Sequence, residues 1–280
     1  MMKTYGIAAA FLAVMIAVPP VSSAATVGNA SSTDIPRGTG IFNLKRDRDL
    51  SVKAGGDLEF ILERKISADA ASGAKISRGQ WYMSKISYGF LNDRIEPYVK
   101  LGTAHFKSQW NEAGASAQLE SNTGFAWGLG AKALIFDFKQ PRLKFIGDVQ
   151  YRTADLDVDK GTRNGVASAI DKSRSRFTIR EWQATLLAQT EIDFARAGKE
   201  EVLGVSALAP YVGVGYSDMN GRMRLTQQNG VFCNPGQISS KNKVGLIVGC
   251  DVMGVDAVSL NLEGRFIDET AFSGGLDVLF

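Results

Sequence analysis

The stretch Phe125-Ala-Trp-Gly-Leu-Gly-Ala-Lys-Ala-Leu-Ile135 alternates between two kinds of residue. Phe125, Trp127 and Leu129 share one face of an extended chain, and Ala131, Ala133 and Ile135 continue that face. Gly128, Gly130 and Lys132 fall on the opposite face. A period of two predicts a β-strand, here with one apolar face and one small, partly charged face.

The same alternation recurs in nine further segments, separated by turn residues such as those at 92–94 and 139–141. They are Leu58–Leu62, Gln80–Phe90, Tyr98–Phe106, Leu143–Tyr151, Trp182–Ile192, Ala207–Met219, Lys243–Met253, Ala257–Ile267 and Ala271–Phe280. Aromatic residues stand near strand ends, as in an interfacial girdle: Trp81, Phe125, Tyr151, Trp182, Tyr216 and Phe280. We predict an all-β fold of about ten strands, with eight also possible.

The charged residues of these segments lie on the face opposite the apolar series. A sheet can cross lipid only as a closed barrel, with an apolar outer face and a lumen that tolerates polar groups. The fold expected is therefore a closed antiparallel transmembrane β-barrel, and the candidate lumen-lining residues are Lys100, Lys132, Asp148, Arg152, Glu181, Glu191, Glu263 and Arg265. A soluble β-sandwich or lipocalin-like barrel, with its apolar face inward, is the alternative.

Connection lengths favour the membrane barrel over that alternative. Short links follow the even strands, whereas the odd strands are followed by three long links that we expect to be external loops, over 108–123, 153–178 and 220–242. Two links fit poorly: 193–206 is long for a periplasmic turn, and 268–270 is short for an outer loop.

The first 24 residues have the layout of a secretory signal peptide. A positive start at Lys3 is followed by an apolar run, and small residues stand before Ala25. We predict a signal peptide over 1–24, a flexible periplasmic arm over 25–55 and the barrel over 56–280.

Composition and charge limit the partners. Hydrophobic residues make up 45% of the chain and charged residues 22%, which is unlike a disordered chain. Of 32 basic residues one, Lys3, lies in the leader, so 31 basic residues face 29 acidic ones in the mature chain. No basic stripe stands out, and we expect no nucleic-acid partner.

Two stretches carry a resemblance to a known family. Ser87-Tyr-Gly-Phe-Leu-Asn-Asp-Arg-Ile-Glu-Pro-Tyr-Val-Lys-Leu-Gly102 and the C-terminal third from Lys243 to Phe280 resemble small outer-membrane barrels of the OmpA-like barrel group. The resemblance implies residence in the outer membrane of a Gram-negative bacterium, contact with its lipid, and insertion by the barrel-insertion machinery, for which Phe280 would be part of the signal. The peptidoglycan-binding domain of many relatives is not expected here.

The sequence offers little for catalysis. Its one histidine, His105, shares parity with outward-facing residues, and we expect it near the external rim without a catalytic partner. Motifs for phosphate loops and metal sites are missing from the sequence, and we expect no enzyme activity, no cofactor and no metal. An even number of cysteines in an exported protein, here Cys233 and Cys250, suggests a disulfide. Cys250 lies seven residues along its strand, however, and its distance from the loop that carries Cys233 argues against the bond. The pairing stays open.

The expected role is structural or surface-exposed, with external segments that contact an unidentified ligand. The alternative is a narrow pore for small solutes, and an outer-membrane enzyme is a weaker third. Pairing of the lumen charges would distinguish the structural role from the pore, because paired charges would fill a narrow lumen. A register that pairs Lys132 with Asp148 is possible, and Arg152 and Glu181 flank one long link near the same rim.

Overall fold

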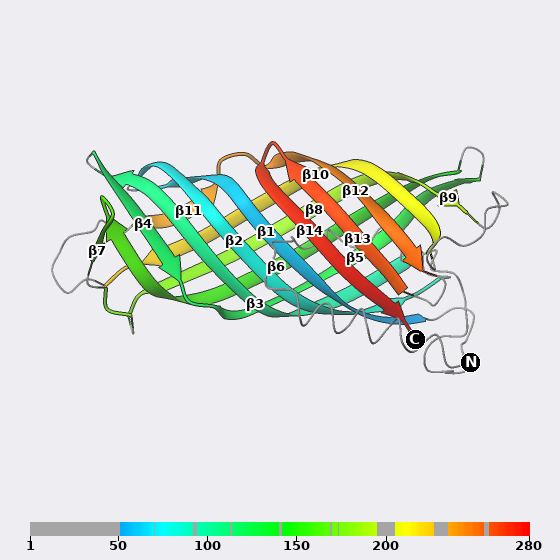
Figure 1. Ribbon diagram of the computed structural model, residues 1–280, viewed down its shortest axis with the longest axis horizontal. Coiled ribbons are helices and arrows are strands. Elements are labelled where there is room, and N and C mark those ends of the chain that lie inside the picture. Colours follow the sequence, from blue (N-terminus) through cyan, green and yellow to red (C-terminus); the bar gives the residue numbers. More distant parts are fainter. Residues whose placement is uncertain are drawn as a thin grey trace.

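The protein is a long β-barrel whose strands are strongly tilted to the barrel axis (Figure 1). The computed structural model describes residues 51–69, 71–91, 94–112, 114–139, 142–168, 170–172, 174–194, 205–226, 235–254 and 258–280. Their strands are β1 (Ser51–Ala68), β2 (Ser72–Gly89), β3 (Ile95–Glu112), β4 (Ala115–Ser121), β5 (Gly124–Lys139), β6 (Arg142–Arg163), β7 (Val166–Ser168), β8 (Arg176–Thr190), β9 (Ile192–Asp193), β10 (Val205–Arg224), β11 (Gly236–Ser240), β12 (Val244–Gly254), β13 (Val258–Phe266) and β14 (Glu269–Leu279).

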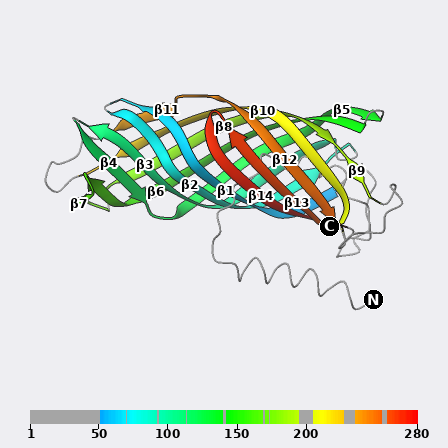
Figure 2. The same cartoon turned by 45° about the horizontal axis from the view of Figure 1, so that its top comes forward.

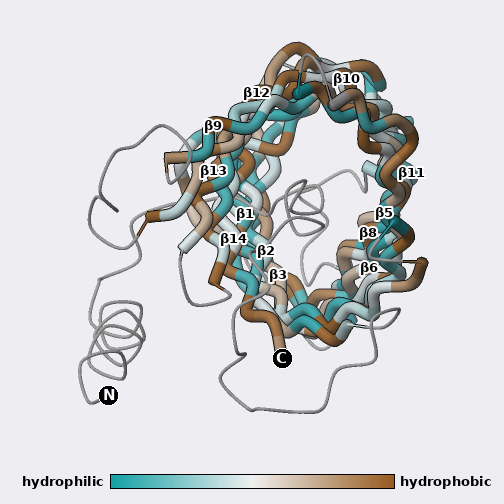
Figure 3. Tube along the Cα trace, turned by 90° about the vertical axis from the view of Figure 1, so that its right-hand side faces the viewer, coloured by the Kyte–Doolittle hydropathy of each residue, from teal (hydrophilic) through white to brown (hydrophobic). Residues whose placement is uncertain are grey.

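Ten of the described strands close into one antiparallel ring, which confirms the predicted fold class. The order around the ring is β1-β2-β3-β5-β6-β8-β10-β12-β13-β14, and β14 pairs with β1 to close it. The view along the barrel axis shows this closure (Figure 3). We call the end that holds the start of β1 and the end of β14 the terminal end, and the opposite end the distal end.

Towards the distal end the ring narrows from ten strands to eight. The β13–β14 hairpin stops early, and β11 takes its place by pairing with β10 on one side and with the last residues of β1 on the other. Likewise β4 replaces β5 between β3 and β6. The distal ring is β1-β2-β3-β4-β6-β8-β10-β11, and β4, β7 and β11 lie at one end of the molecule (Figures 1 and 2).

The long links expected at this end are therefore largely strand rather than loop, and that expectation was wrong. β3 continues to Glu112 and returns as β4, β6 continues to Arg163, and β10 continues to Arg224 before β11 begins. The β13–β14 link, which is short for an outer loop, fits the structure because β11 closes the barrel on the distal side of this hairpin.

Strand β6 shows why the alternation in the sequence did not predict the distal parts of the strands. It has 22 residues, about twice the 9–11 that a tilted strand needs to cross a bilayer. In its first half Val149 faces outward and Arg152 is buried inside, but in its second half Asp155 and Asp157 face outward while Leu156 is buried. The two faces exchange polarity along the strand, because lipid surrounds the first part and water the second.

The outward-facing apolar residues form a belt around the terminal half of the barrel. Aromatic side chains lie at its distal edge, where the Tyr151 and Trp182 rings are 4.9 Å apart and Phe125 and Tyr216 are exposed. The belt also contains Ile86, Val99, Leu101, Trp127, Leu129, Val149, Leu186, Val212, Val214, Val244, Leu246, Val248 and Leu262. An apolar band between interfaces is the arrangement of a transmembrane barrel.

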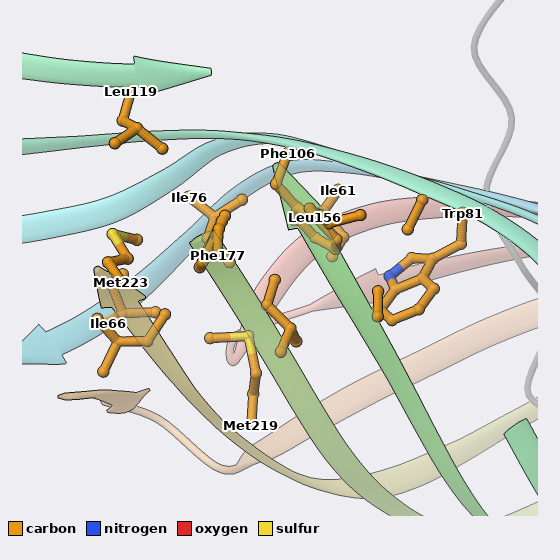
Figure 4. Close-up of a cluster of buried hydrophobic side chains, with 14 of the residues drawn as sticks. Ile61, Ile66, Ile76, Trp81, Phe106, Leu119, Leu156, Phe177, Met219 and Met223 are labelled. Carbon is orange, nitrogen blue, oxygen red and sulfur yellow. The ribbon is translucent and has the colours of Figure 1, made fainter. Parts of the chain in front are cut away.

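Inside the distal section apolar side chains fill the barrel. Figure 4 shows Phe106, Leu156, Phe177 and Met219 converging from different strands. We call this cluster the distal core. Trp81 belongs to it and is fully buried, with its ring 5.4 Å from that of Phe106, so its prediction as a girdle residue was wrong.

The boundary predicted between arm and barrel also moves. Strand β1 begins at Ser51, so residues 51–55 pair in the sheet rather than belonging to the arm. The predicted signal peptide and residues 25–50 lie outside the described residues. Among the described residues, no helix has the length and apolarity to cross a membrane.

Candidate functional site

The interior of the terminal half holds a dense set of charged side chains, and its distal layer is built on three arginines. Arg152 of β6 donates from Nη2 to Glu59 Oε1 of β1 at 2.6 Å and from Nε to Glu181 Oε2 of β8 at 2.6 Å. Because β1 and β6 are four strands apart in the ring, the Arg152–Glu59 pair crosses the lumen.

Arg64 of β1 makes the second crossing. Its Nη1 pairs with Glu181 of β8, the strand diametrically opposite in the ring of ten, and its Nη2 donates to Ser217 Oγ and Ser240 Oγ at 2.8 Å each. Ser240 belongs to β11, the strand that closes the distal ring, so Arg64 also connects β11 to this layer.

Arg265 of β13 completes the layer. It lies 2.6 Å from Glu59 and 2.9 Å from Glu269. We call Arg64, Arg152 and Arg265, with Glu59, Glu181 and Glu269, the arginine cluster. Arg152 also lies over the Trp81 ring, 4.4 Å from its centroid, so the cluster packs directly against the distal core.

Nearer the terminal end the cations are lysines. Lys53 Nζ lies 2.6 Å from Glu96, and Lys132 shares that carboxylate at 3.4 Å. Lys85 pairs with Asp277 at 2.7 Å and Lys100 with Asp57 at 2.8 Å. We call these seven residues the lysine cluster, and the four ammonium groups each have an acidic partner. Buried charges persist in proteins when they are paired in this way.

Two tyrosines reach into the lumen over glycines. The Tyr98 hydroxyl donates to Asp148 Oδ1 at 2.7 Å, and the Tyr211 hydroxyl to Glu263 Oε2 at 3.0 Å. A Cβ on Gly130 would lie 2.5 Å from the Tyr98 ring, and a Cβ on Gly249 would lie 2.3 Å from the Tyr211 ring. These glycines leave room for rings that fill the lumen.

The predicted lumen residues fall into two groups. Seven are buried inside the barrel: Lys100, Lys132, Asp148, Arg152, Glu181, Glu263 and Arg265. The eighth, Glu191, follows β8 at the terminal mouth, where its partly exposed carboxylate lies 3.2 Å from Lys144. Lys132 stands directly opposite Asp148 in the β5–β6 ladder, and Arg152 directly opposite Glu181 in the β6–β8 ladder.

Several residues of the interior were not among the predicted ones. Glu59 and Lys85 lie within predicted strands and have the parity of the charged face, so the alternation rule alone would have found them. Arg64 and Glu269 lie just beyond the predicted strand ends. Only the longer strands of the structure bring these two residues into the barrel.

His105 faces outward on β3, as its parity indicated. Its Nε2 lies 3.8 Å from Glu120 Oε1 of the neighbouring β4. Burial lowers the pKa of this imidazole below its ordinary value, and the Glu120 charge opposes that shift only in part.

Cys250 lies on β12, half-buried on the belt side, next to the inward Asp251. Cys233 falls outside the described residues, so the structure does not test a pairing of Cys233 with Cys250. In the ranges that the structure describes, histidine, cysteine and acidic side chains do not gather in groups of three or more that suit a metal ion.

Comparison with known proteins finds similarity among solved barrels. No family model matches the chain, and a search of curated proteins finds no match. The translocator domain of the autotransporter NalP from Neisseria meningitidis is 12% identical over 85% of this chain and 90% of that chain, with a TM-score of 0.35. The outer membrane protein OprG from Pseudomonas aeruginosa is 11% identical over 84% and 97%, with a TM-score of 0.37. The outer membrane protease OmpT from Escherichia coli is 12% identical over 83% and 95%, with a TM-score of 0.37. Similarities at this level assign no activity to the chain.

Proposed function

We propose that the protein is a non-conducting barrel of the bacterial outer membrane, with a structural and surface-exposed role. The observation that carries the proposal is the pair of ionic contacts across the lumen, Arg152 with Glu59 and Arg64 with Glu181. A ten-stranded barrel has a narrow interior. Side chains that meet from opposite walls leave little room for a continuous water path.

The distal core supports the same proposal. Phe106, Leu156 and Phe177 fill the eight-stranded section directly beyond the arginine cluster. A hydrated ion that passed the cluster would next meet packed apolar side chains, which solvate charge poorly. Conduction would therefore require both the arginine cluster and the distal core to rearrange.

The distribution of polarity supports the proposed location. Membrane barrels with an apolar outer band reside in outer membranes, with short turns on the periplasmic side and longer segments outside. The distal section extends beyond the belt and exposes Asp155 and Asp157, so it requires water around it. We place the distal end outside the cell and the terminal end in the periplasm, with export by the predicted leader.

The C-terminal strand has the position that insertion by the barrel-insertion machinery would require. β14 closes the ring against β1, and the Phe280 amide donates to Val52 O at 3.0 Å. The role of Phe280 as an insertion signal, like membership of the OmpA-like barrel group, rests on sequence resemblance. Deletion of Phe280 should reduce the amount of folded protein in the outer membrane, whereas Phe266→Leu should not.

Single-channel recording in a planar bilayer tests the proposal. The refolded protein should give no discrete current steps, with folding and insertion shown by heat-modifiable gel mobility and with a refolded general porin as the conducting control. Reproducible steps from the wild-type protein would overturn the proposal. They would assign the pore function instead, and Arg152→Gln and Glu59→Gln would then change the ion selectivity.

A catalytic role is not part of the proposal. His105 faces the outer surface, where its imidazole lies 3.8 Å from the Glu120 carboxylate and forms a hydrogen bond with the backbone of Ser121. His105→Ala should therefore leave hydrolysis of lipid and peptide substrates at the level of the wild-type protein. An activity above background that disappears in this variant would assign an enzyme.

The surface role concerns the distal turns. The distal strands carry these turns on a rigid framework, which suits contact with a ligand outside the cell. Protease treatment of intact cells followed by an adhesion assay tests this role. Adhesion that is unchanged after the turns are cleaved would remove it.

A further inference from the structure

A recess of about 550 Å³ lies near the distal end, at β1, β2 and the end of β11. Three lysines line it, one from each of three neighbouring segments: Lys65 on β1, Lys75 on β2 and Lys241 directly after β11. One carboxylate, Glu63, is the only acidic residue among the lining residues described, so the recess carries a formal charge of +2.

The backbone fixes these lysines beside one another. Lys65 and Lys75 are direct cross-strand partners in the β1–β2 ladder, and the Lys241 amide donates to Lys65 O at 3.2 Å. Like charges directly opposite in a ladder destabilise a sheet. Glu63 pairs with Lys75 at 2.7 Å and compensates one of the three charges. A further anion would relieve the remaining repulsion.

The height of the recess matches a headgroup layer. Lys65 lies three residues beyond Leu62, the last outward apolar residue of β1, and Lys241 lies three residues before Val244, where the belt begins on β12. With about 3.3 Å per residue and a tilt of about 40°, three residues correspond to roughly 7 Å along the barrel axis. The polar layer of a bilayer extends about that far beyond its hydrocarbon core.

Small residues make the recess accessible. Ala68, Ala71 and Gly73 surround its distal side, where the β1–β2 hairpin turns. The volume of the recess is several times that of a phosphate group, so it has room for the phosphate together with part of the sugar that carries it. Acyl chains of the same molecule would lie along the apolar belt below.

We propose that this recess binds a phosphate group of a phosphorylated glycolipid in the outer leaflet. The proposal rests on the orientation given under the proposed function, because the distal end must face that leaflet. Lysine ammonium groups bind phosphate as point charges, and basic residues beside a membrane surface attract anionic headgroups. Three lysines from adjacent segments around one recess provide such a binding site.

The test uses the full refolded chain in detergent micelles, with purified diphosphoryl lipid A as the probe and native mass spectrometry as the readout. The triple variant Lys65→Gln, Lys75→Gln and Lys241→Gln should bind about 100-fold more weakly, since each surface lysine contributes roughly a factor of five. The matched control removes three exposed distal cations outside the recess, with Lys160→Gln, Lys172→Gln and Arg174→Gln. It should lose less than threefold.

Three results would overturn the inference. Equal weakening by both triple variants would mean diffuse charge attraction. Undiminished binding of dephosphorylated lipid A would mean acyl-chain contacts with the belt alone. Full displacement of the probe by millimolar inorganic phosphate would assign the recess to a free anion. Because micelles expose both ends of the barrel, these results do not depend on the conductance test or on the orientation in cells. A cysteine introduced on the distal surface and labelled on intact cells tests that orientation separately.

Discussion

Arg152 and Glu59 stand on strands four positions apart in the ring and nevertheless form a bidentate ion pair across the lumen. The same Glu59 also binds Arg265, and Arg152 also binds Glu181. The barrel is thus held by contacts across its lumen as well as around its circumference. Each carboxylate of this layer serves more than one arginine, so the layer behaves as a unit.

Breaking this pair should be costly. Arg152→Met should lower the free energy of unfolding by about 3–5 kcal/mol, because Glu59 and Glu181 would keep buried charges with one partner fewer. The double variant Arg152→Met with Glu59→Gln should lose at least about 1 kcal/mol less than the sum of the two single variants. Reversible urea unfolding in lipid vesicles measures both, and strictly additive losses would mean that the two residues do not interact.

The four tryptophans should divide into two pairs by environment. Trp127 and Trp182 are 38% and 55% exposed on the belt, whereas Trp81 and Trp110 are 0% and 3% exposed inside the barrel. Brominated lipids should quench the fluorescence of the first pair and leave that of the second pair nearly unchanged. Single-tryptophan variants with Phe at the other three positions allow the measurement. Strong quenching of Trp81 would contradict the polarity that we describe.

Gly130 should not accept a side chain. Gly130→Ala should destabilise the barrel by about 1–3 kcal/mol, the usual range for overpacking, because its Cβ would meet both the Tyr98 ring and Val149 O within 2.7 Å. Gly56→Ala is the matched control, since the nearest atom to its Cβ is 3.7 Å away. In a Tyr98→Leu background the Gly130→Ala loss should shrink, and a loss of unchanged size would show that the ring is not the obstacle.

The single histidine gives a clean titration. Burial lowers the pKa of His105, so its ring resonances should titrate with a midpoint below 6.5. Since the unfolded chain then binds the proton more tightly, the contribution of His105 to stability is present above pH 6.5 and is lost as the pH falls towards the folded pKa. Removing the Glu120 charge with Glu120→Gln should lower the midpoint further, whereas a rise would reverse the assigned cause.

The sequence by itself predicted a closed antiparallel barrel of about ten strands, with eight also possible, and the inward face of most charges. Alternation of period two is a local property, and a segment such as Phe125–Ile135 displays it without any partner. The parity of Lys132 and Asp148 therefore predicted their burial. Their direct opposition in the ladder was one possible register from the sequence, and the structure adopts it.

The alternation argument did not predict the strands of the distal section. The apolar face changes sides between Arg152 and Asp155, so an alternation with one fixed polarity breaks there and suggests a loop. The sequence contains the reversed pattern, with Ala154, Leu156 and Val158 inward, but its meaning depends on where lipid gives way to water. Trp81 was misplaced for the same reason.

Only the tertiary structure decided which charges meet. Arg64 and Glu181 are 117 residues apart, and no local pattern specifies which strands stand diametrically opposite. That relationship follows from the closure of ten strands and from the shear between them. The replacement of β13 and β14 by β11 was likewise invisible in the sequence, because it depends on a pairing between β11 and the end of β1, far apart in the chain. Local periodicity determined what each strand is, and ring closure determined which side chains fill the barrel together.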